Sequence, residues 1–416
     1  MSRKLVYFEI AGYSEPIRYM LHYGGLKFDD VRYNRQEWPI KEIKDSLPYG
    51  QLPIYEEDGR VLNQSIAIAR YVASQTGLLP TDPWEQAKLD AAVLTIYDLI
   101  KKLATFFYAK EEEQEKVKKQ VLEDVEYYYS RFEKELHAGG GYFGGKLSWA
   151  DFILVSVTEL LNSQLKQTVN TEYPAITALI SEIHANPGVK EYMANKKSSA
   201  PVLQSQNSIN MSRKLSYFNV NGYTEAIRYM LHYGNVQFED VRYDHSQWPI
   251  KEVKDSLPYG QLPIYEEDGR VLNQSIAIAR YVASQTGLLP ADLWEQAKLD
   301  AAVLNVYDLL KKLVAYYYES DPKKREDAKK TLEGEIVFFY SRFDKELKAN
   351  GGHFGGKLSW ADFILVGAVE LLNLYMNDTL QTNYPAIAAL VSEIHGYPGV
   401  KVYVSKREPY KPPQLE

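Results

Sequence analysis

The 416-residue sequence contains no cysteine. This absence excludes disulfide bonds, thiolate catalysis by the protein itself and any metal site that needs a cysteine ligand. Long apolar runs are missing too: no segment approaches the ~18 apolar residues of a membrane-spanning helix, and the residues after Met1 lack the apolar stretch of a secretory signal. We therefore expect a cytoplasmic protein without a membrane partner, and any thiol in its chemistry must come from a substrate.

An excess of positive charge is also missing. The net charge is −7 at pH 7 and the sequence pI is near 5.7, whereas a nucleic-acid surface needs clustered Lys and Arg. The seven histidines are scattered, and no metal-ligand cluster, phosphate-binding loop or catalytic triad stands out. The charge run at 111–119 is typical of a solvated helix face. We expect neither a nucleic-acid partner nor a metal cofactor.

A long internal repeat organises the sequence. Residues 44–80 are identical, letter for letter, to residues 254–290. This period is far longer than the roughly 20–50 residues of a solenoid repeat, so it indicates a duplicated globular unit. Residues 196–210 are polar and contain Ser and Pro, which is typical of a linker. We call the copy before this linker repeat 1 and the copy after it repeat 2.

The apolar spacing changes once along each repeat. The first part of repeat 1 reads β-α-β and then β-β-α, with Asp58-Gly59 as the turn of a hairpin. Beyond Pro83 the spacing is helical throughout, and Ser148 and Asp151 have the form of a capping box. We therefore predict, in each repeat, an α/β domain followed by an all-α domain. The predicted boundaries are 1–78 and 84–195 in repeat 1, and 211–288 and 294–408 in repeat 2.

Several short motifs, in a fixed order, carry a resemblance to a known family. They are Tyr7-Phe8, Glu15-Pro16-Ile17-Arg18, Trp38-Pro39, Pro48-Tyr49-Gly50-Gln51-Leu52-Pro53, Asn63-Gln64-Ser65-Ile66-Ala67 and Leu147-Ser148-Trp149-Ala150-Asp151. Together they resemble the sigma class of cytosolic glutathione transferases, the insect members above all. The resemblance runs through both repeats. It implies a thioredoxin-like domain followed by a helical domain, present twice in one chain.

The resemblance implies that Tyr7 and Tyr217 are catalytic. Glutathione, the implied co-substrate, has a thiol with an unperturbed pKa of about 8.5, so only a few per cent is thiolate at pH 7. A hydroxyl aimed at the sulfur stabilises the thiolate and lowers that pKa. The alternative is that both residues are packing residues, because the chain contains 34 tyrosines.

The resemblance also implies the residues that bind glutathione. Leu52-Pro53 matches the family's cis-proline turn, and Gln64-Ser65 lies at a helix N-terminus, which suits a carboxylate. Alternatives remain open: Lys41 rivals Lys44, Ser65 also reads as a plain helix cap, and Gln51 as a strand-start polar residue. Asp98 and Asp308 match an acidic residue that reaches the neighbouring subunit's glutathione, or they are surface carboxylates. The full set is Trp38, Lys44, Gln51, Leu52, Pro53, Gln64, Ser65 and Asp98, with Trp248, Lys254, Gln261, Leu262, Pro263, Gln274, Ser275 and Asp308 in repeat 2.

One departure from the family pattern concerns the residue soon after the catalytic tyrosine. Many sigma members carry an Arg there that supports the hydroxyl, whereas this chain has Tyr13 and Tyr223. These tyrosines are expected to line an apolar, aromatic acceptor pocket. Its candidate residues are Phe8, Tyr13, Phe106 and Tyr108 in repeat 1, and Phe218, Tyr223, Tyr316 and Tyr318 in repeat 2. The differences between the repeats reflect either different acceptors or neutral drift.

Three functions remain open from the sequence. The first is conjugation of glutathione to small apolar electrophiles, for example unsaturated aldehydes or aryl halides. The second is glutathione-dependent isomerisation of the prostaglandin type. The third is a non-catalytic ligand carrier or a crystallin-like structural protein. Because the family's active form is a two-fold dimer, we expect the two repeats to pair as an intramolecular pseudo-dimer.

Overall fold

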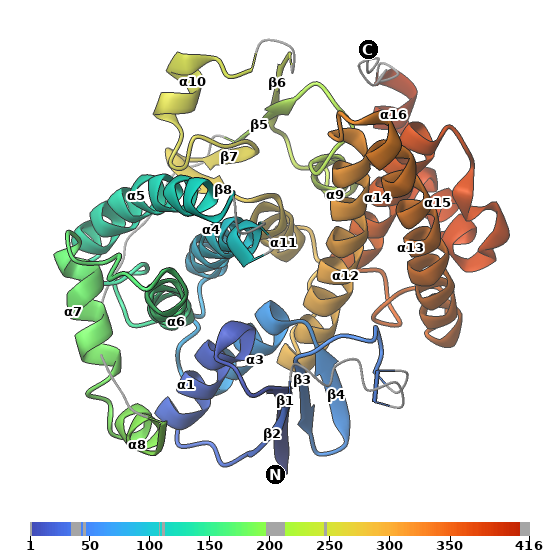
Figure 1. The fold of residues 1–416 in the computed structure, drawn as a ribbon. Coiled ribbons are helices and arrows are strands. Elements are labelled where there is room, and N and C mark those ends of the chain that lie inside the picture. Colours follow the sequence, from blue (N-terminus) through green and yellow to red (C-terminus); the bar gives the residue numbers. More distant parts are fainter. Residues whose placement is uncertain are drawn as a thin grey trace. The chain divides into compact units, whose positions relative to one another are not determined.

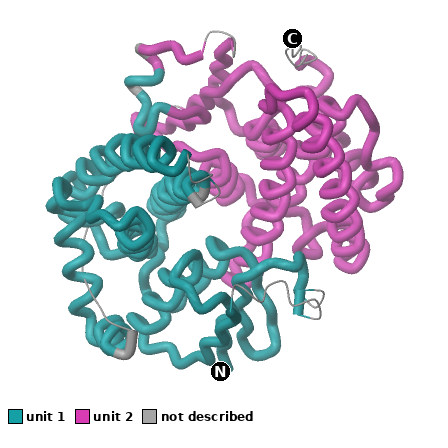
Figure 2. Tube along the Cα trace, in the orientation of Figure 1, with its two compact units in different colours: residues 1–209, 254–260 teal, residues 210–253, 261–416 magenta. Residues whose placement is uncertain are grey.

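The structure, a computed structural model, describes residues 2–34, 43–44, 47–107, 109, 113–196, 213–244 and 248–407. The chain divides into two compact units (Figure 2). Unit 1 comprises residues 1–209 together with 254–260, and unit 2 comprises residues 210–253 and 261–416. Each unit thus holds one repeat, except that a seven-residue segment of repeat 2 belongs to unit 1.

Each unit contains a four-stranded mixed sheet. In unit 1 the order is β2-β1-β3-β4, with β1 parallel to β2 and antiparallel to β3. Asp58 and Gly59 join β3 to β4 with φ of 48° and 81°, the left-handed geometry that a tight hairpin turn requires. The strands are β1 (Arg3–Phe8), β2 (Asp29–Tyr33), β3 (Ile54–Glu57) and β4 (Arg60–Asn63), and, in the same order in unit 2, β5 (Arg213–Phe218), β6 (Glu239–Tyr243), β7 (Ile264–Glu267) and β8 (Arg270–Asn273).

Two helices cover each sheet. In unit 1, α1 (Glu15–Tyr23) packs against α3 (Ser65–Gln75) on one side of the strands (Figure 1). Helix α1 buries Ile17, Met20 and Leu21, which recur at helical spacing. Their counterparts in unit 2 are α9 (Glu225–Tyr233) and α11 (Ser275–Gln285), and a further short helix, α10 (Lys251–Ser256), lies before β7. The predicted thioredoxin-like fold is confirmed in both repeats.

The remainder of each repeat is helical. The helices are α4 (Pro83–Phe107), α5 (Gln114–Ala138), α6 (Trp149–Leu165), α7 (Pro174–Ile183) and α8 (Pro187–Lys196), then α12 (Leu293–Tyr317), α13 (Pro322–Ala349), α14 (Trp360–Met376), α15 (Pro385–Gly396) and α16 (Pro398–Lys406), with 3-10 turns at Gly12–Ser14 and Leu380–Asn383. Within the described residues, none of these helices is both long and apolar enough to cross a membrane.

Helix α6 begins at the predicted capping box. The Asp151 carboxylate accepts hydrogen bonds from the backbone N–H of Ser148, at 2.8 Å, and of Phe143, at 3.1 Å. Ser148 Oγ donates to the same carboxylate at 2.7 Å. Asp151 is fully buried and burial raises its pKa to about 7. Helix α6 packs against both α1 and α4. The buried capping box therefore fixes the N-terminus of a helix that contacts both domains of repeat 1.

The seven-residue segment in unit 1 is held by α5. The Tyr259 ring lies 5.9 Å from the Phe132 ring and 6.4 Å from the Tyr128 ring. Its hydroxyl donates to Glu135 Oε2 at 2.7 Å, and its carbonyl accepts from the Tyr127 hydroxyl at 2.8 Å. Only 5% of Tyr259 is exposed. Tyr259 is therefore part of the core of unit 1.

Candidate functional site

The predicted catalytic tyrosine lies near the end of the first strand in each unit. Tyr7 is buried, and its hydroxyl accepts a hydrogen bond from the backbone N–H of Tyr13 at 3.4 Å. Gly12 allows this approach, because a Cβ built there would lie only 2.9 Å from Tyr7 Oη, and Gly12 has φ of +49°. One lone pair of the hydroxyl is thus occupied by a backbone N–H of the protein.

Tyr217 in unit 2 has the same surroundings. A Cβ at Gly222 would lie 3.0 Å from its hydroxyl. Burial raises the pKa of Tyr217, as does the nearby Tyr223 hydroxyl, while the Tyr223 backbone N–H and the Arg228 guanidinium lower it. Because the pKa stays above its ordinary value, the hydroxyl is protonated at neutral pH and is a hydrogen-bond donor.

A stacked pair of tyrosines lies behind this hydroxyl. The Tyr13 and Tyr97 rings are 5.6 Å apart and 14° from parallel, and the Tyr223 and Tyr307 rings are 5.2 Å apart and 15° from parallel. Tyr97 and Tyr307 come from the long helices α4 and α12 and were not among the predicted site residues. A tyrosine on a long helix carries no local signal that distinguishes it from a packing residue.

The start of helix α3 forms a second part of the site. Gln64, its N-cap, has φ of 70° and ψ of 115°, and Gln274 has the same conformation. Such a backbone costs about 1–3 kcal/mol and is concentrated at ligand-binding sites. It leaves the first N–H groups of the helix without helical partners, which suits an anion. Gln64 Nε2 donates to Gln51 Oε1 at 3.4 Å, so two of the predicted glutathione contacts lie together.

The two parts are joined through Ser65. The Tyr97 hydroxyl donates to Ser65 Oγ at 3.5 Å, and the Tyr307 hydroxyl donates to Ser275 Oγ at 3.0 Å.

The predicted cis bonds are confirmed at Leu52–Pro53 and Leu262–Pro263, directly before β3 and β7, and Trp248–Pro249 is also cis.

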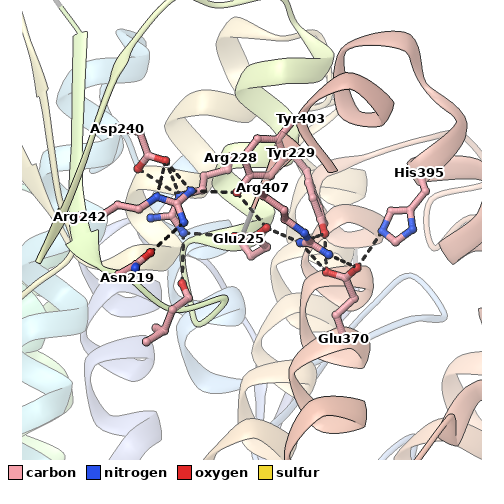
Figure 3. Close-up of polar contacts among 11 residues, drawn as sticks. Asn219, Glu225, Arg228, Tyr229, Asp240, Arg242, Glu370, His395, Tyr403 and Arg407 are labelled. Atoms are coloured by element: carbon pink, nitrogen blue, oxygen red, sulfur yellow. Dashed lines mark hydrogen bonds and ion pairs between the residues drawn. The ribbon is translucent and has the colours of Figure 1, made fainter. Parts of the chain in front are cut away.

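A buried arginine holds the loop after the first strand, as Figure 3 shows for unit 2. Arg228 is fully buried, and its guanidinium donates to the Val220 carbonyl at 3.3 Å, to Glu225 Oε2 at 3.2 Å and to Asp240. In unit 1, Arg18 makes the equivalent contact to the Ile10 carbonyl at 3.2 Å.

The role of this arginine was not predicted, although Arg18 lies within a motif that carried the resemblance. Its signal in the sequence is an Arg three residues after a Glu in an otherwise apolar helix. The electrostatic effect of Arg228 lowers the pKa of Tyr217, against the larger effect of burial.

A second arginine ties α9 to the end of the chain in unit 2 (Figure 3). Arg407 Nη1 donates to Glu225 Oε1 at 2.5 Å and to the Tyr229 hydroxyl at 2.6 Å, and Nη2 donates to Glu370 Oε1 at 2.9 Å. Burial alone would raise the pKa of Glu370, but hydrogen bonds from His395 and Arg407 lower it to about 2. In unit 1, burial raises the pKa of the matching Glu159 to about 7.

Aromatic rings gather beside Tyr217. The Phe218 ring lies 5.2 Å from Tyr217 and 5.3 Å from Trp248. Tyr318 is near enough for its hydroxyl to raise the pKa of Tyr217, and it is 63% exposed. These contacts, with the stacked Tyr223, bring together three of the predicted acceptor residues of repeat 2.

Fewer contacts are described for the other predicted acceptor residues. The predicted Tyr318 contacts Tyr317, which is half-buried and also contacts Tyr375, with ring distances of 4.9 Å in both pairs. Tyr375 was not among the predicted residues. Tyr316 is half-buried on the same helix. In unit 1, the Phe8 ring lies 5.1 Å from Tyr7, and Phe106 is half-buried near the end of α4. Tyr108 lies outside the described residues.

The remaining glutathione-binding candidates have varied surroundings. A Cβ at Gly50 would lie 3.2 Å from Lys44 Cε, so this exposed lysine runs along the turn before the cis proline, and Lys254 does the same beside Gly260. Trp38 and its neighbour Lys41 lie outside the described residues.

The two predicted acidic contacts form ion pairs on their own helices. Asp98 Oδ1 lies 2.5 Å from Lys101 Nζ, and Asp308 Oδ1 lies 2.6 Å from Lys311 Nζ. Their reach toward a neighbouring glutathione stays a prediction. Among the described residues, no group of three or more His, Asp or Glu side chains is placed to hold a metal ion.

Comparison with protein families assigns both parts of each repeat. The glutathione S-transferase N-terminal domain matches residues 3–74 and 213–284, and the glutathione S-transferase C-terminal domain matches residues 97–196 and 307–407. The chain belongs to the glutathione S-transferase family. This glutathione S-transferase carries both domains twice, in tandem, and glutathione is its co-substrate.

Individual relatives each align with about half of this glutathione S-transferase. A glutathione S-transferase of Anopheles gambiae is 37% identical over 196 residues, which are 47% of this chain and 96% of the relative. Glutathione S-transferase S1 of Drosophila melanogaster is 35% identical and covers 48% of this chain and 80% of its own length. Hematopoietic prostaglandin D synthase of Homo sapiens is 32% identical and covers 47% of this chain and 96% of its own length.

Proposed function

We propose that each repeat conjugates the glutathione thiolate to small apolar electrophiles such as unsaturated aldehydes and aryl halides, with Tyr7 and Tyr217 as the catalytic hydroxyls. The observation that carries this proposal is that, in each unit, a buried tyrosine hydroxyl accepts a hydrogen bond from the backbone N–H of the loop after the first strand. When glutathione binds, this hydroxyl donates a hydrogen bond to the sulfur. The thiol loses its proton to solvent, the hydroxyl stabilises the thiolate, and the sulfur forms a bond to the electrophilic carbon. With an aryl halide the carbon–halogen bond breaks and halide leaves. With an unsaturated aldehyde the C=C π bond breaks and the α-carbon takes a proton from solvent.

Glutathione binding is assigned along the same site. The γ-glutamyl carboxylate binds Ser65 and the first turn of α3, where N–H groups and the helix dipole favour an anion. The Leu52 backbone before the cis proline pairs with the cysteinyl backbone, Gln51 and Gln64 flank it, and Trp38 and Lys44 hold the glycyl end. Unit 2 uses Leu262, Pro263, Gln261, Gln274, Ser275, Trp248 and Lys254 in the same way.

The acceptor lies against the aromatic side chains. In unit 2, Phe218, Tyr223 and Tyr318 lie near Tyr217, and an aromatic lining selects apolar molecules. We assign the protein to the sigma class on the motifs that both repeats share, and a cytoplasmic role in detoxification goes with that assignment.

The two repeats are further proposed to pair within one chain, with Asp98 serving the site of repeat 2 and Asp308 that of repeat 1. In support, residues 254–260 belong to repeat 2 by sequence and to unit 1 by their contacts. The seven-residue segment is anchored there by Tyr259.

A glutathione-dependent isomerase is the second candidate. The observation in its favour is the 32% identity to a prostaglandin D synthase over 199 residues. Both reactions need the same thiolate, so the loss of a catalytic hydroxyl does not separate them. Product analysis does: conjugation consumes glutathione, and isomerisation returns it.

Steady-state conjugation to an aryl halide and to an unsaturated aldehyde tests the proposal. The intact chain is compared with Tyr7→Phe, Tyr217→Phe and the double variant. We expect turnover by the intact chain and a loss of about a hundredfold or more in the double variant, because a hydroxyl worth about two pKa units is removed. Binding of glutathione without turnover of either acceptor by the intact chain would leave the carrier or isomerase role as the better explanation.

A further inference from the structure

An unbroken set of contacts links the start of α3 to the catalytic hydroxyl. From Ser65 Oγ it passes to the Tyr97 hydroxyl, at 3.5 Å, through the Tyr97 ring to the stacked Tyr13 ring, and from the Tyr13 N–H to Tyr7 Oη, at 3.4 Å. Unit 2 has the same set through Ser275, Tyr307, Tyr223 and Tyr217, with the first contact at 3.0 Å.

Tyr97 is suited to hold neighbouring groups in place and not to react with a substrate. Only 7% of Tyr97 and 9% of Tyr307 is exposed, so neither ring forms part of an open surface. Burial raises the pKa of each hydroxyl, which keeps it protonated as a donor to the serine. A buried tyrosine hydroxyl needs a partner, and here the serine Oγ accepts its hydrogen bond.

The serine hydroxyl can take part in two hydrogen bonds at once. Its oxygen accepts from Tyr97, and its proton remains available to a carboxylate at the start of α3. Hydrogen bonds in such a series polarise one another, so a carboxylate that accepts from Ser65 strengthens the bond from Tyr97. An anion at α3 therefore fixes the Tyr97 ring, and through the stack it fixes the loop that holds Tyr7.

We propose that Tyr97 and Tyr307 are positioning residues that couple occupancy of the γ-glutamyl carboxylate site to the placement of the catalytic hydroxyl. This inference rests on the proposed function, because it assigns the carboxylate of glutathione to Ser65 and Ser275. Ring stacking and a series of hydrogen bonds thus act on the same loop that Arg18 and Arg228 hold through its carbonyls.

Two substitutions separate the hydroxyl from the ring. Tyr97→Phe keeps the stack and removes the bond to Ser65, so we expect the KM for glutathione to rise about fivefold with kcat changed less than twofold. Tyr97→Leu also removes the stack, so kcat is expected to fall about tenfold and the apparent pKa of the bound thiol to rise. Both are measured in a Tyr217→Phe chain, where only repeat 1 turns over, and Tyr307 variants are measured in a Tyr7→Phe chain.

A thiol substrate without the γ-glutamyl carboxylate separates coupling from a merely structural role of Tyr97. Structural damage would change the KM of both substrates, whereas loss of the coupling changes only the KM for glutathione. Cysteinylglycine lacks the γ-glutamyl unit, so Tyr97→Phe should leave its KM unchanged. Tyr129→Phe is the matched control: Tyr129 is fully buried and its hydroxyl pairs with Thr158 at 2.7 Å, away from the site. This control is expected to leave both KM values unchanged.

The outcomes distinguish the two proposals. If the Tyr217→Phe chain turns over and Tyr97→Phe has the same KM for glutathione, or affects cysteinylglycine equally, the coupling is wrong and the transferase assignment stands. If that chain has no turnover, the transferase assignment fails for repeat 1, and calorimetry with glutathione alone still decides the coupling. A fivefold weaker Kd in Tyr97→Phe, absent in Tyr129→Phe, supports it, and equal Kd values overturn it.

Discussion

Gly12 brings the loop close to the catalytic hydroxyl because it has no side chain. We predict that Gly12→Ala lowers kcat of repeat 1 at least tenfold, because a Cβ 2.9 Å from Tyr7 Oη must displace the hydroxyl, and a displacement of about 1 Å can reduce a rate by a hundredfold. Conjugation by a Tyr217→Phe chain measures the effect on repeat 1 alone.

Gly25 supplies the control for this substitution. It has φ of +62°, similar to the +49° of Gly12, but a Cβ there would meet nothing within 4 Å. Gly25→Ala therefore carries the same backbone cost without the contact, and we expect unchanged kcat. Equal losses of activity in the two variants would mean that backbone strain, and not the contact with Tyr7, is responsible.

Residue types explain which parts of the site could be predicted. Tyr7, Ser65 and the cis proline lie in short motifs, where each chemical role needs a certain residue at a certain place along the chain. Tyr97 and Arg228 act through tertiary contacts, the first across to the loop after β1 and the second to a backbone carbonyl. No spacing in the sequence carries that information.

At the element scale, the capping box of α14 is predicted to contribute more than an exposed cap. Asp362 is fully buried and accepts from Ser359 N and Oγ, both at 2.7 Å, and from Phe354 N at 3.0 Å. Asp362→Ala removes the cap and leaves three buried donors without a partner. We expect the free energy of unfolding to fall by about 3 kcal/mol or more, measured by urea denaturation.

Asp292, the N-cap of α12, is the matched comparison. It accepts from Glu295 N at 2.8 Å in an exposed position, so Asp292→Ala is expected to cost about 1 kcal/mol. Similar losses for Asp292→Ala and Asp362→Ala would show that burial of the carboxylate adds nothing to the cap.

Elements with a strong local pattern were predicted well. The β3–β4 hairpin follows from Asp58-Gly59, and α6 from its capping box. Helix α10 was not predicted, because its six residues are too few to show a helical period. The helices that follow α6 were predicted only as part of a helical domain, since their ends are set by packing against α5 and α6.

At the scale of the whole molecule, the repeats differ in the pKa of a half-buried glutamate, Glu159 in repeat 1 and Glu370 in repeat 2. Glu370 has a pKa of about 2 beside Arg407, below its ordinary value of 4.5. A lowered pKa stabilises the fold above pH 4.5, and this stabilisation is lost as the pH falls toward 2. Arg407→Gln should therefore lower the free energy of unfolding of unit 2 by about 3 kcal/mol at pH 7, with a smaller loss at pH 3.

Hydrogen exchange of peptides from α14 and α16, followed from pH 7 to pH 3, measures this difference. Arg407→Lys is the control, because lysine keeps the charge and is the residue at the matching position, Lys196, in repeat 1. A loss of protection in Arg407→Gln that is the same at every pH would contradict the role of charge and indicate lost packing only.

The placement of Tyr259 in unit 1 has a consequence for biosynthesis. Ribosomes synthesise the chain from the N-terminus at roughly 5–20 residues per second. All of repeat 1 has therefore been made seconds before Tyr259 is available to pack against Phe132 and Tyr128. During that interval the aromatic face of α5 is open to solvent, so a chain truncated between the repeats would present this face to chaperones, or to another nascent chain.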